Sequence, residues 1–158
     1  MIEYKNILFC TDFSEDANIA FLHSLDLAKK HNAKLHILHA PHSSYAYCKH
    51  PVHEHALEGS HEGVPKRAKA ALTEEYQNKL GDFDDYLFVV KEGSPDVEII
   101  RYAKKCNIDV IVMGALGKSE QERIEHGSTV SNVSKYAHCH VIAIRNPASQ
   151  FTLPGSMY

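Results

Sequence analysis

The chain has 158 residues, of which 44% are hydrophobic and 23% charged, a composition typical of one globular domain with a sizeable core. Seventeen Lys and Arg residues against twenty Asp and Glu residues give a formal net charge of −3, which argues against general binding to nucleic acid or to an anionic membrane. No apolar run approaches the length of a bilayer span and residues 1–5 carry no secretory apolar region, so we expect a cytoplasmic protein.

Strand-like and helix-like segments alternate from the first residues onward. A short apolar run ends at Thr11, and Ser14 then predicts a helix N-cap followed by two acidic residues. We expect this helix to end near Asn32 and to bury one stripe of residues, namely Ala17, Ala20, Phe21, Ser24, Leu27 and Ala28. The segment therefore predicts a strand that turns directly into a helix.

The remaining elements follow in the same alternation. Ser94 and Pro95 open a helix in which we expect an apolar stripe at helical spacing, made by Val97, Ile100, Ala103 and Cys106. The other predicted helices span residues 65–80 and 128–137. The predicted strands span residues 6–10, 35–40, 86–90, 108–114 and 140–145.

Five short strands separated by four helices predict an open, doubly wound parallel α/β sheet, because parallel strands need crossover connections and these are nearly always right-handed. We find one domain over residues 1–147 and a tail over residues 148–158. In such sheets, ligands bind beyond the carboxyl ends of the strands where the strand order reverses. If the first and fourth strands are neighbours, Asp12 and Gly114 face one crevice.

Three of the chain's eight glycines lie between the end of the fourth predicted strand and the start of the next predicted helix. Gly114 and Gly117 would let the backbone approach a ligand closely. Gly127, Ser128 and Thr129 open the next helix, whose free amide groups and positive dipole end favour an anion. The sequence therefore predicts a ligand that carries phosphate.

The spacing Gly114-x2-Gly117-x9-Gly127-Ser128 resembles the G-x2-G-x9-G-[S/T] motif of the ATP-binding universal stress proteins. Residues 7–15, 35–40 and 141–145 resemble that family's first, second and last strands, and the resemblance covers residues 5–147. It implies a five-stranded sheet of order 3-2-1-4-5 with helices on both faces. It also implies binding of ATP, or of ADP or AMP, with Mg or Mn, and a homodimer joined along the last strand.

The resemblance also implies roles for single residues around the base and ribose. Asp12, which follows Thr11 in the same turn, would bond the ribose or the base edge. Cys10 and Ala40 would line the adenine, at positions where the family often has proline and valine, and Met113 and Gly114 would border the ribose. A plainer interpretation is that Asp12 stabilises a helix start and that Gly114 ends a strand.

The phosphates would be held by the glycine-rich segment. By the same resemblance, Gly117 and Gly127 present backbone amides, Ser128 and Thr129 add a hydroxyl and further amides, and Lys118 reaches the phosphates as a point charge. A simple helix cap could account for Gly127 and Ser128, but not for Gly117 at a fixed spacing. Phosphate binding is thus the better explanation of the whole set.

Seven of the twelve histidines lie between His36 and His61, close to Cys48. Imidazole and thiolate are ligands that zinc, copper and nickel prefer, so a metal-buffering or metal-sensing role is one alternative. The spacing matches no common zinc pattern, and we assign no metal ligands. The four cysteines are scattered without a Cys-x-x-Cys pair, which fits free thiols in a reducing compartment.

Three hypotheses for function follow. The first is a nucleotide-responsive module whose occupancy orders residues 118–126 and changes a surface that an unidentified protein partner reads. The second is an ATP-using enzyme of the adenine-nucleotide α-hydrolase type, but residues 11–15 lack the glycines of its phosphate loop, and we find no complete Walker loop or catalytic triad. The third is the metal-binding role.

Overall fold

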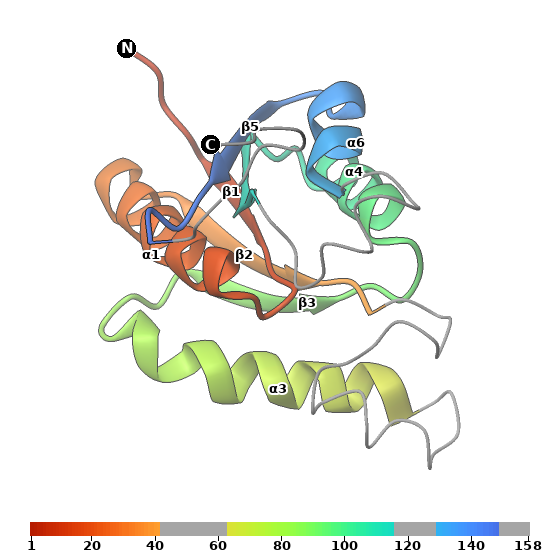
Figure 1. Cartoon of the computed structure of the whole chain (residues 1–158). Coiled ribbons are helices and arrows are strands. Elements are labelled where there is room, and N and C mark those ends of the chain that lie inside the picture. Colours follow the sequence, from red (N-terminus) through yellow and green to blue (C-terminus); the bar gives the residue numbers. More distant parts are fainter. Residues whose placement is uncertain (42–62, 116–128, 149–158) are drawn as a thin grey trace, which may run out of the picture.

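Strands and helices alternate through the chain as the sequence predicts (Figure 1). The computed structural model describes residues 1–41, 63–115 and 129–148. The elements are β1 (Asn6–Cys10), α1 (Glu15–His31), β2 (Lys34–His39), α3 (Gly63–Leu80), β3 (Tyr86–Val90), α4 (Pro95–Lys105), β4 (Val110–Gly114), α6 (Thr129–Tyr136) and β5 (His140–Ile144). The predicted tail lies almost wholly outside the described residues.

The strands form one parallel sheet of order β3-β2-β1-β4-β5, which confirms the predicted topology. The chain moves outward from β1 to β2 and β3, then crosses back to place β4 on the other side of β1. The strand order therefore reverses between β1 and β4. In this register Cys10 lies opposite Leu38 on one side and Met113 on the other, so these strands end together.

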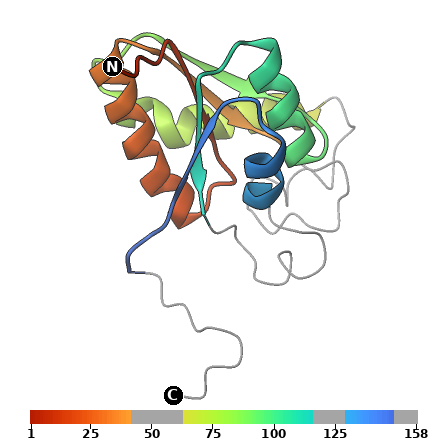
Figure 2. The ribbon, with the colours of Figure 1, turned by 90° about the horizontal axis from the view of Figure 1, so that it is seen from above.

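Helices cover both faces of the sheet, α1 and α3 on one and α4 and α6 on the other (Figure 2). Successive residues of a strand point to opposite faces, so each strand feeds two cores. In β1, Phe9 packs toward α1 and α3 in one cluster, whereas Leu8 packs toward α4 in the other. Burial on both faces explains why the central strands are almost continuously apolar.

The predicted start and end of α1 are confirmed. The Ser14 hydroxyl accepts a hydrogen bond from the Ala17 amide at 3.2 Å, and Asn32 ends the helix in a left-handed conformation with φ of 50°. Within the predicted stripe, Leu27 is only partly buried, and Leu25 is buried instead. Leu25 follows Phe21 by four residues, which keeps both side chains on one face.

The inward face predicted for α4 is wrong by part of a turn. Ile99 and Tyr102 are buried together with Ala103, whereas Val97 is 45% exposed. Apolar spacing alone did not distinguish the stripe at Val97 and Ile100 from the neighbouring one. Tyr102 decides the rotation, because its hydroxyl lies 2.8 Å from a buried imidazole nitrogen of the sheet.

Helix α4 begins at the predicted residues, but its N-cap makes no side-chain bond to the helix backbone. Ser94 occupies the cap position, but its hydroxyl donates to Asp96 Oδ1 rather than accepting from the helix backbone. Asp96 instead accepts the Val97 amide at 2.9 Å and the Asn132 side-chain amide at 2.7 Å, which ties α4 to α6.

Among the helices described, none has the combined length and apolarity that crossing a bilayer requires.

Candidate functional site

The carboxyl ends of β1 and β4 form the centre of the candidate site. These strands are parallel neighbours, so Asp12 after β1 and Gly114 at the end of β4 reach the same edge of the sheet. The chain passes from β1 into α1 through residues 11–14, and α6 begins after β4 at Thr129. This edge is therefore the place where ligands bind in open α/β sheets.

Three of the residues predicted to contact the nucleotide share one face of the sheet. Cys10, Ala40 and Met113 belong to the core cluster on the α4 and α6 side, and they are 6%, 8% and 5% exposed. They come from β1, from just after β2 and from β4, three adjacent strands. The arrangement puts two small side chains and one flexible thioether in a row just below the carboxyl edge.

Thr11 points to the opposite face, where its hydroxyl is engaged by the protein. Thr11 Oγ1 accepts the Phe13 amide at 2.9 Å and lies 2.6 Å from the Tyr76 hydroxyl, which donates to Asn18 Oδ1 at 3.1 Å. The Thr11 carbonyl accepts a hydrogen bond from His39 Nδ1 at 2.8 Å. These bonds give Thr11 a structural role that needs no ligand. Its contact with a nucleotide stays a prediction.

Gly114 touches the start of α1. A Cβ added at this residue would lie 2.8 Å from the Ala17 nitrogen and 2.9 Å from the Asp16 carbonyl carbon. These are backbone atoms, so they cannot move aside as the end of a flexible side chain could. Close packing of α1 on β4 thus requires glycine here, independently of any ligand.

A strained turn holds Asp12 at the edge of the site. Phe13 has φ of 62°, a left-handed conformation that a bulky residue seldom adopts and that costs of the order of 1–3 kcal/mol. The Asp12 carboxylate is exposed and accepts the Ser14 amide through Oδ1 at 2.9 Å. Phe13 also packs on His39 and Tyr76, with ring centroids 4.7 and 6.2 Å away. Strain of this kind tends to persist at functional turns that the surrounding structure stabilises.

Asp16 links the far strand to the same edge. Its side chain is buried, and Oδ1 accepts the Asn146 amide at 3.1 Å, so the chain after β5 is held against the first turn of α1. Sequence reasoning identified Asp16 only as an acid near a helix start. The contact joins residues 130 positions apart, and no local pattern signals it.

Two buried side chains near the site, Cys10 and Tyr76, are kept in their neutral, protonated form. Burial raises the pKa of the Cys10 thiol far above its ordinary value, and burial likewise raises the pKa of the Tyr76 hydroxyl. A protonated thiol is a poor nucleophile, so the Cys10 thiol behaves as a small apolar side chain of the core. The carboxylate of Asp12 is exposed at this edge.

Thr129 is the first residue of α6, as predicted to within one position. The other phosphate-binding candidates, Gly117, Lys118, Gly127 and Ser128, lie outside the described residues, as does most of the His-rich segment. In the chain segments described, no group of three or more His, Cys, Asp or Glu residues is placed to hold a metal ion. His36 and His39 point to opposite faces of β2, toward Tyr102 and Thr11, so these two cannot share one ion.

Comparison with known proteins supplies the family. The model of the universal stress protein family matches residues 3–145. The chain belongs to the universal stress protein family. It is 30% identical to the universal stress protein MJ0577 of Methanocaldococcus jannaschii, over 94% of this chain and 99% of that protein. It also resembles the solved universal stress protein UspA from Lactobacillus plantarum, at 33% identity and a TM-score of 0.72 over 92% of this chain and 100% of that one.

Two more distant members of this family were solved with adenine nucleotides. One is a universal stress protein in complex with cAMP, 23% identical with a TM-score of 0.60, over 90% of this chain and 98% of that one. The other is a family member from Arabidopsis thaliana with AMP bound, 18% identical with a TM-score of 0.58, over 91% and 93%. At these identities the likeness is one of fold.

Proposed function

We propose that this universal stress protein binds an adenine nucleotide, ATP or else ADP or AMP, at the carboxyl edge of β1 and β4 and acts as a nucleotide-responsive regulatory module. The observation that carries the proposal is the row formed by Cys10, Ala40 and Met113 beneath an edge that bears the Asp12 carboxylate. An apolar wall with one nearby hydrogen-bond acceptor suits a purine base and a ribose hydroxyl.

The chemistry of the residues fits the ligand from base to phosphate. Cys10 and Ala40 have small side chains, against which a flat ring would pack. Asp12 would accept a hydrogen bond from the ribose or the base edge, and Gly114 and Met113 would border the sugar. The phosphates and a bound Mg or Mn ion would be held by the segment from Gly117 to Thr129, which carries the glycine motif. The metal would neutralise phosphate charge.

Relatives by fold support the ligand class. The cAMP complex and the AMP-bound protein from Arabidopsis thaliana each carry an adenine nucleotide, and both superpose on about nine tenths of this chain. An adenine base and a ribose phosphate are common to cAMP, AMP and ATP. We therefore choose the adenosine phosphate as the recognised unit and take the number of phosphates as the quantity to measure.

The experiment is equilibrium dialysis of the purified full chain after removal of co-purified nucleotide. Labelled ATP, ADP, AMP and cAMP are each offered with and without Mg²⁺ or Mn²⁺, and GTP serves as the matched control for the base. We expect saturable uptake of at least one adenine nucleotide and none of GTP. No uptake of any adenine nucleotide by folded, metal-supplied protein would overturn the proposal.

We also propose a homodimer joined along β5. The His140 amide donates to the Asp109 carbonyl and the Ala115 amide donates to the Ile144 carbonyl, so alternate residues of β5 bond to β4. The backbone groups of Val141 and Ala143 then face away from the sheet. An apolar edge strand with outward donors and acceptors is a template for pairing with a second copy.

A further inference from the structure

The other edge of the sheet, β3, also presents outward backbone groups. Leu35 donates to the Asp85 carbonyl at 2.9 Å and Lys91 donates to the His39 carbonyl at 3.2 Å. Because hydrogen bonds alternate along a parallel ladder, the intervening residues of β3 turn their backbone groups away from β2. These residues are Tyr86, Phe88 and Val90.

Few of these outward groups have a partner within the described ranges. The Tyr86 amide donates to the Asp84 carbonyl at 3.0 Å, which closes the turn before the strand. No other strand of the described residues lies opposite the outward groups of β3, which are the amide and carbonyl groups of Phe88 and Val90 and the carbonyl of Tyr86. They can therefore pair with one further strand.

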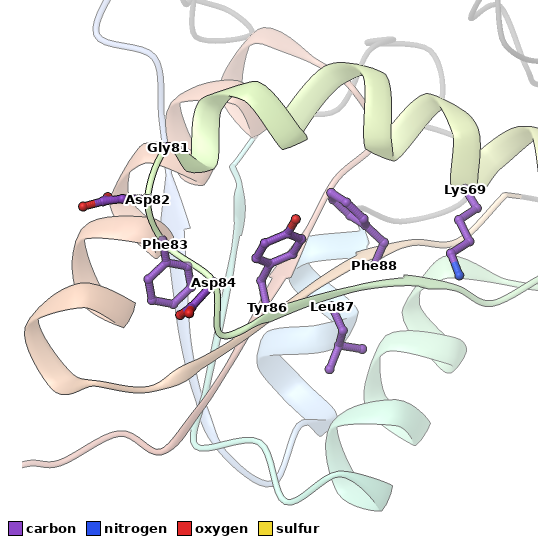
Figure 3. A pocket seen from close by; sticks show the side chains of 8 residues that line it. All are labelled: Lys69, Gly81, Asp82, Phe83, Asp84, Tyr86, Leu87 and Phe88. Atoms are coloured by element: carbon purple, nitrogen blue, oxygen red, sulfur yellow. The ribbon is translucent and has the colours of Figure 1, made fainter.

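A groove of about 600 Å³ runs beside this edge, between β3 and α3 (Figure 3). Tyr86 and Phe88 point toward α3 and lie edge to face with ring centroids 5.4 Å apart, whereas Leu87 points away from α3. Phe83 continues the aromatic lining before the strand. An added strand would thus gain aromatic surface beside it as well as backbone hydrogen bonds.

The groove has a charge of opposite sign at each end. Asp82 and Asp84 lie beyond Tyr86, whereas Lys69 projects from α3 beyond Phe88 (Figure 3). Asp82 already pairs with Lys29 at 3.2 Å, so Asp84 supplies the acidic end. Exposed charges add little affinity, but they select the orientation and identity of a charged partner.

The strand itself lacks the usual protection of an edge. Tyr86–Val90 contains no charged residue, glycine or proline, and the charged residues Asp85 and Lys91 next to it direct their backbone bonds toward β2. A second copy is the poorer occupant. If β5 edges pair in a homodimer, pairing of β3 edges as well would join sheets end to end without closure. The open edge with charged ends fits a segment of a different protein.

We infer that the β3 edge is a docking site for an extended peptide segment of another protein. The segment adds a sixth strand by bonding to the backbone of Phe88 and Val90. It carries Lys or Arg where it passes Asp84 and Asp or Glu where it passes Lys69. The site lies at the sheet edge formed by β3, away from β1 and β4, so the inference stands independently of nucleotide binding, whereas the choice of another protein as the occupant rests on the proposed β5 homodimer.

The test is titration of the ¹⁵N-labelled full chain with defined peptides, followed by NMR. Two probes satisfy the charge rule in the two strand directions, acetyl-Glu-Val-Thr-Val-Thr-Lys-amide and acetyl-Lys-Val-Thr-Val-Thr-Glu-amide. We expect at least one of them, at millimolar concentration, to shift the amide signals of Phe88 and Val90 more than those of Leu87 and Val89. A version with serine at both ends should bind several-fold more weakly.

Two variants test the β3 edge and its acidic end. Phe88→Pro removes one outward amide together with one ring of the groove, without breaking a bond to β2, and it should abolish the shifts at Val90. Asp84→Lys, at an exposed position that keeps the fold, should weaken both charged probes several-fold. Ala143→Pro, on the opposite edge, is the matched control and should leave binding unchanged.

Three outcomes would overturn the inference. The first is that neither probe shifts the amide signals of Phe88 or Val90. The second is that a folded Phe88→Pro variant binds the probes as well as the original chain does. The third is that the same amide signals move when the protein alone is concentrated. The last outcome would make a second copy the occupant.

Discussion

Gly114 and Ala17 are in such close contact that a Cβ at Gly114 would lie 2.8 Å from the Ala17 nitrogen. The contact fixes the start of α1 against the end of β4, and with it the turn that carries Asp12. One glycine of the nucleotide motif therefore has a packing role that can be measured without any ligand.

Gly114→Ala should lower the free energy of unfolding by about 1–3 kcal/mol, because the added methyl group meets backbone atoms. Denaturant unfolding measures the loss. Gly63→Ala is the matched control, since the nearest side-chain atom is 3.9 Å from the added Cβ, and it should cost nothing. Equal stability of Gly114→Ala and the original chain would contradict the packing argument.

Asp12→Asn separates the two interpretations of Asp12. Asparagine can still accept the Ser14 amide, so the turn and the melting temperature should be preserved. The loss of the charged acceptor should lower ATP affinity by about ten-fold, as expected for a hydrogen bond to a charged group. Calorimetric titration measures the change. If affinity is unchanged while Asp12→Ala destabilises the fold, Asp12 serves the turn alone.

Gly117→Val and Gly127→Val should each abolish ATP uptake in equilibrium dialysis. A β-branched side chain at either position would occupy the space that the motif assigns to phosphate oxygens. Thermal unfolding without ligand should stay close to that of the original chain. Gly63→Val, in α3, is the control and should bind normally. Full affinity in either motif variant would place the phosphates elsewhere.

The stability of the protein should fall in acid through His36. Burial, followed by the nearby charge of Lys34, lowers the His36 pKa below its ordinary value of 6.5, while Asp85 opposes the shift. The unfolded chain then binds the proton more readily, so the stabilisation is complete above pH 6.5 and declines as the pH falls toward the folded-state pKa.

His36→Gln should flatten this decline, by about 1.4 kcal/mol for each unit by which folding lowers the pKa. Urea unfolding between acid and neutral pH measures the difference between variant and original chain. His23→Gln, at an exposed position, should leave the decline as it is. An identical slope for His36→Gln and the original chain would exclude His36 as its source.

Ala143→Pro should convert the proposed homodimer to a monomer, because proline removes an amide that faces outward from β5. Light scattering on a sizing column measures the mass. Phe88→Pro, on the opposite edge, should leave the dimer intact. A monomeric original chain, or a dimeric Ala143→Pro variant, would remove the proposed β5 interface.

The ends of α1 and the alternation of strands with helices were predictable because they depend on local signals, whereas the strand order was predicted only through the family resemblance. Ser14 and Asn32 mark the helix ends by side-chain chemistry and backbone conformation, and alternation of strands with helices leaves few topologies. The inward face of α4 was not predictable, because Val97 and Ile100 form as good an apolar stripe as the residues that are buried. The partner of Tyr102, a histidine on β2, decides between them.

The sequence by itself determined the fold class, and its family resemblance predicted the strand order that the structure confirms. The carboxyl edge of the sheet as the place of a ligand stays a prediction. Only the tertiary structure separated Cys10, Ala40 and Met113 from Thr11, which bonds to Tyr76 on the other face. It alone showed that Gly114 is required by α1. The physical reason is that spacing along a chain specifies which residues share an element, whereas the contact between elements specifies what each side chain meets.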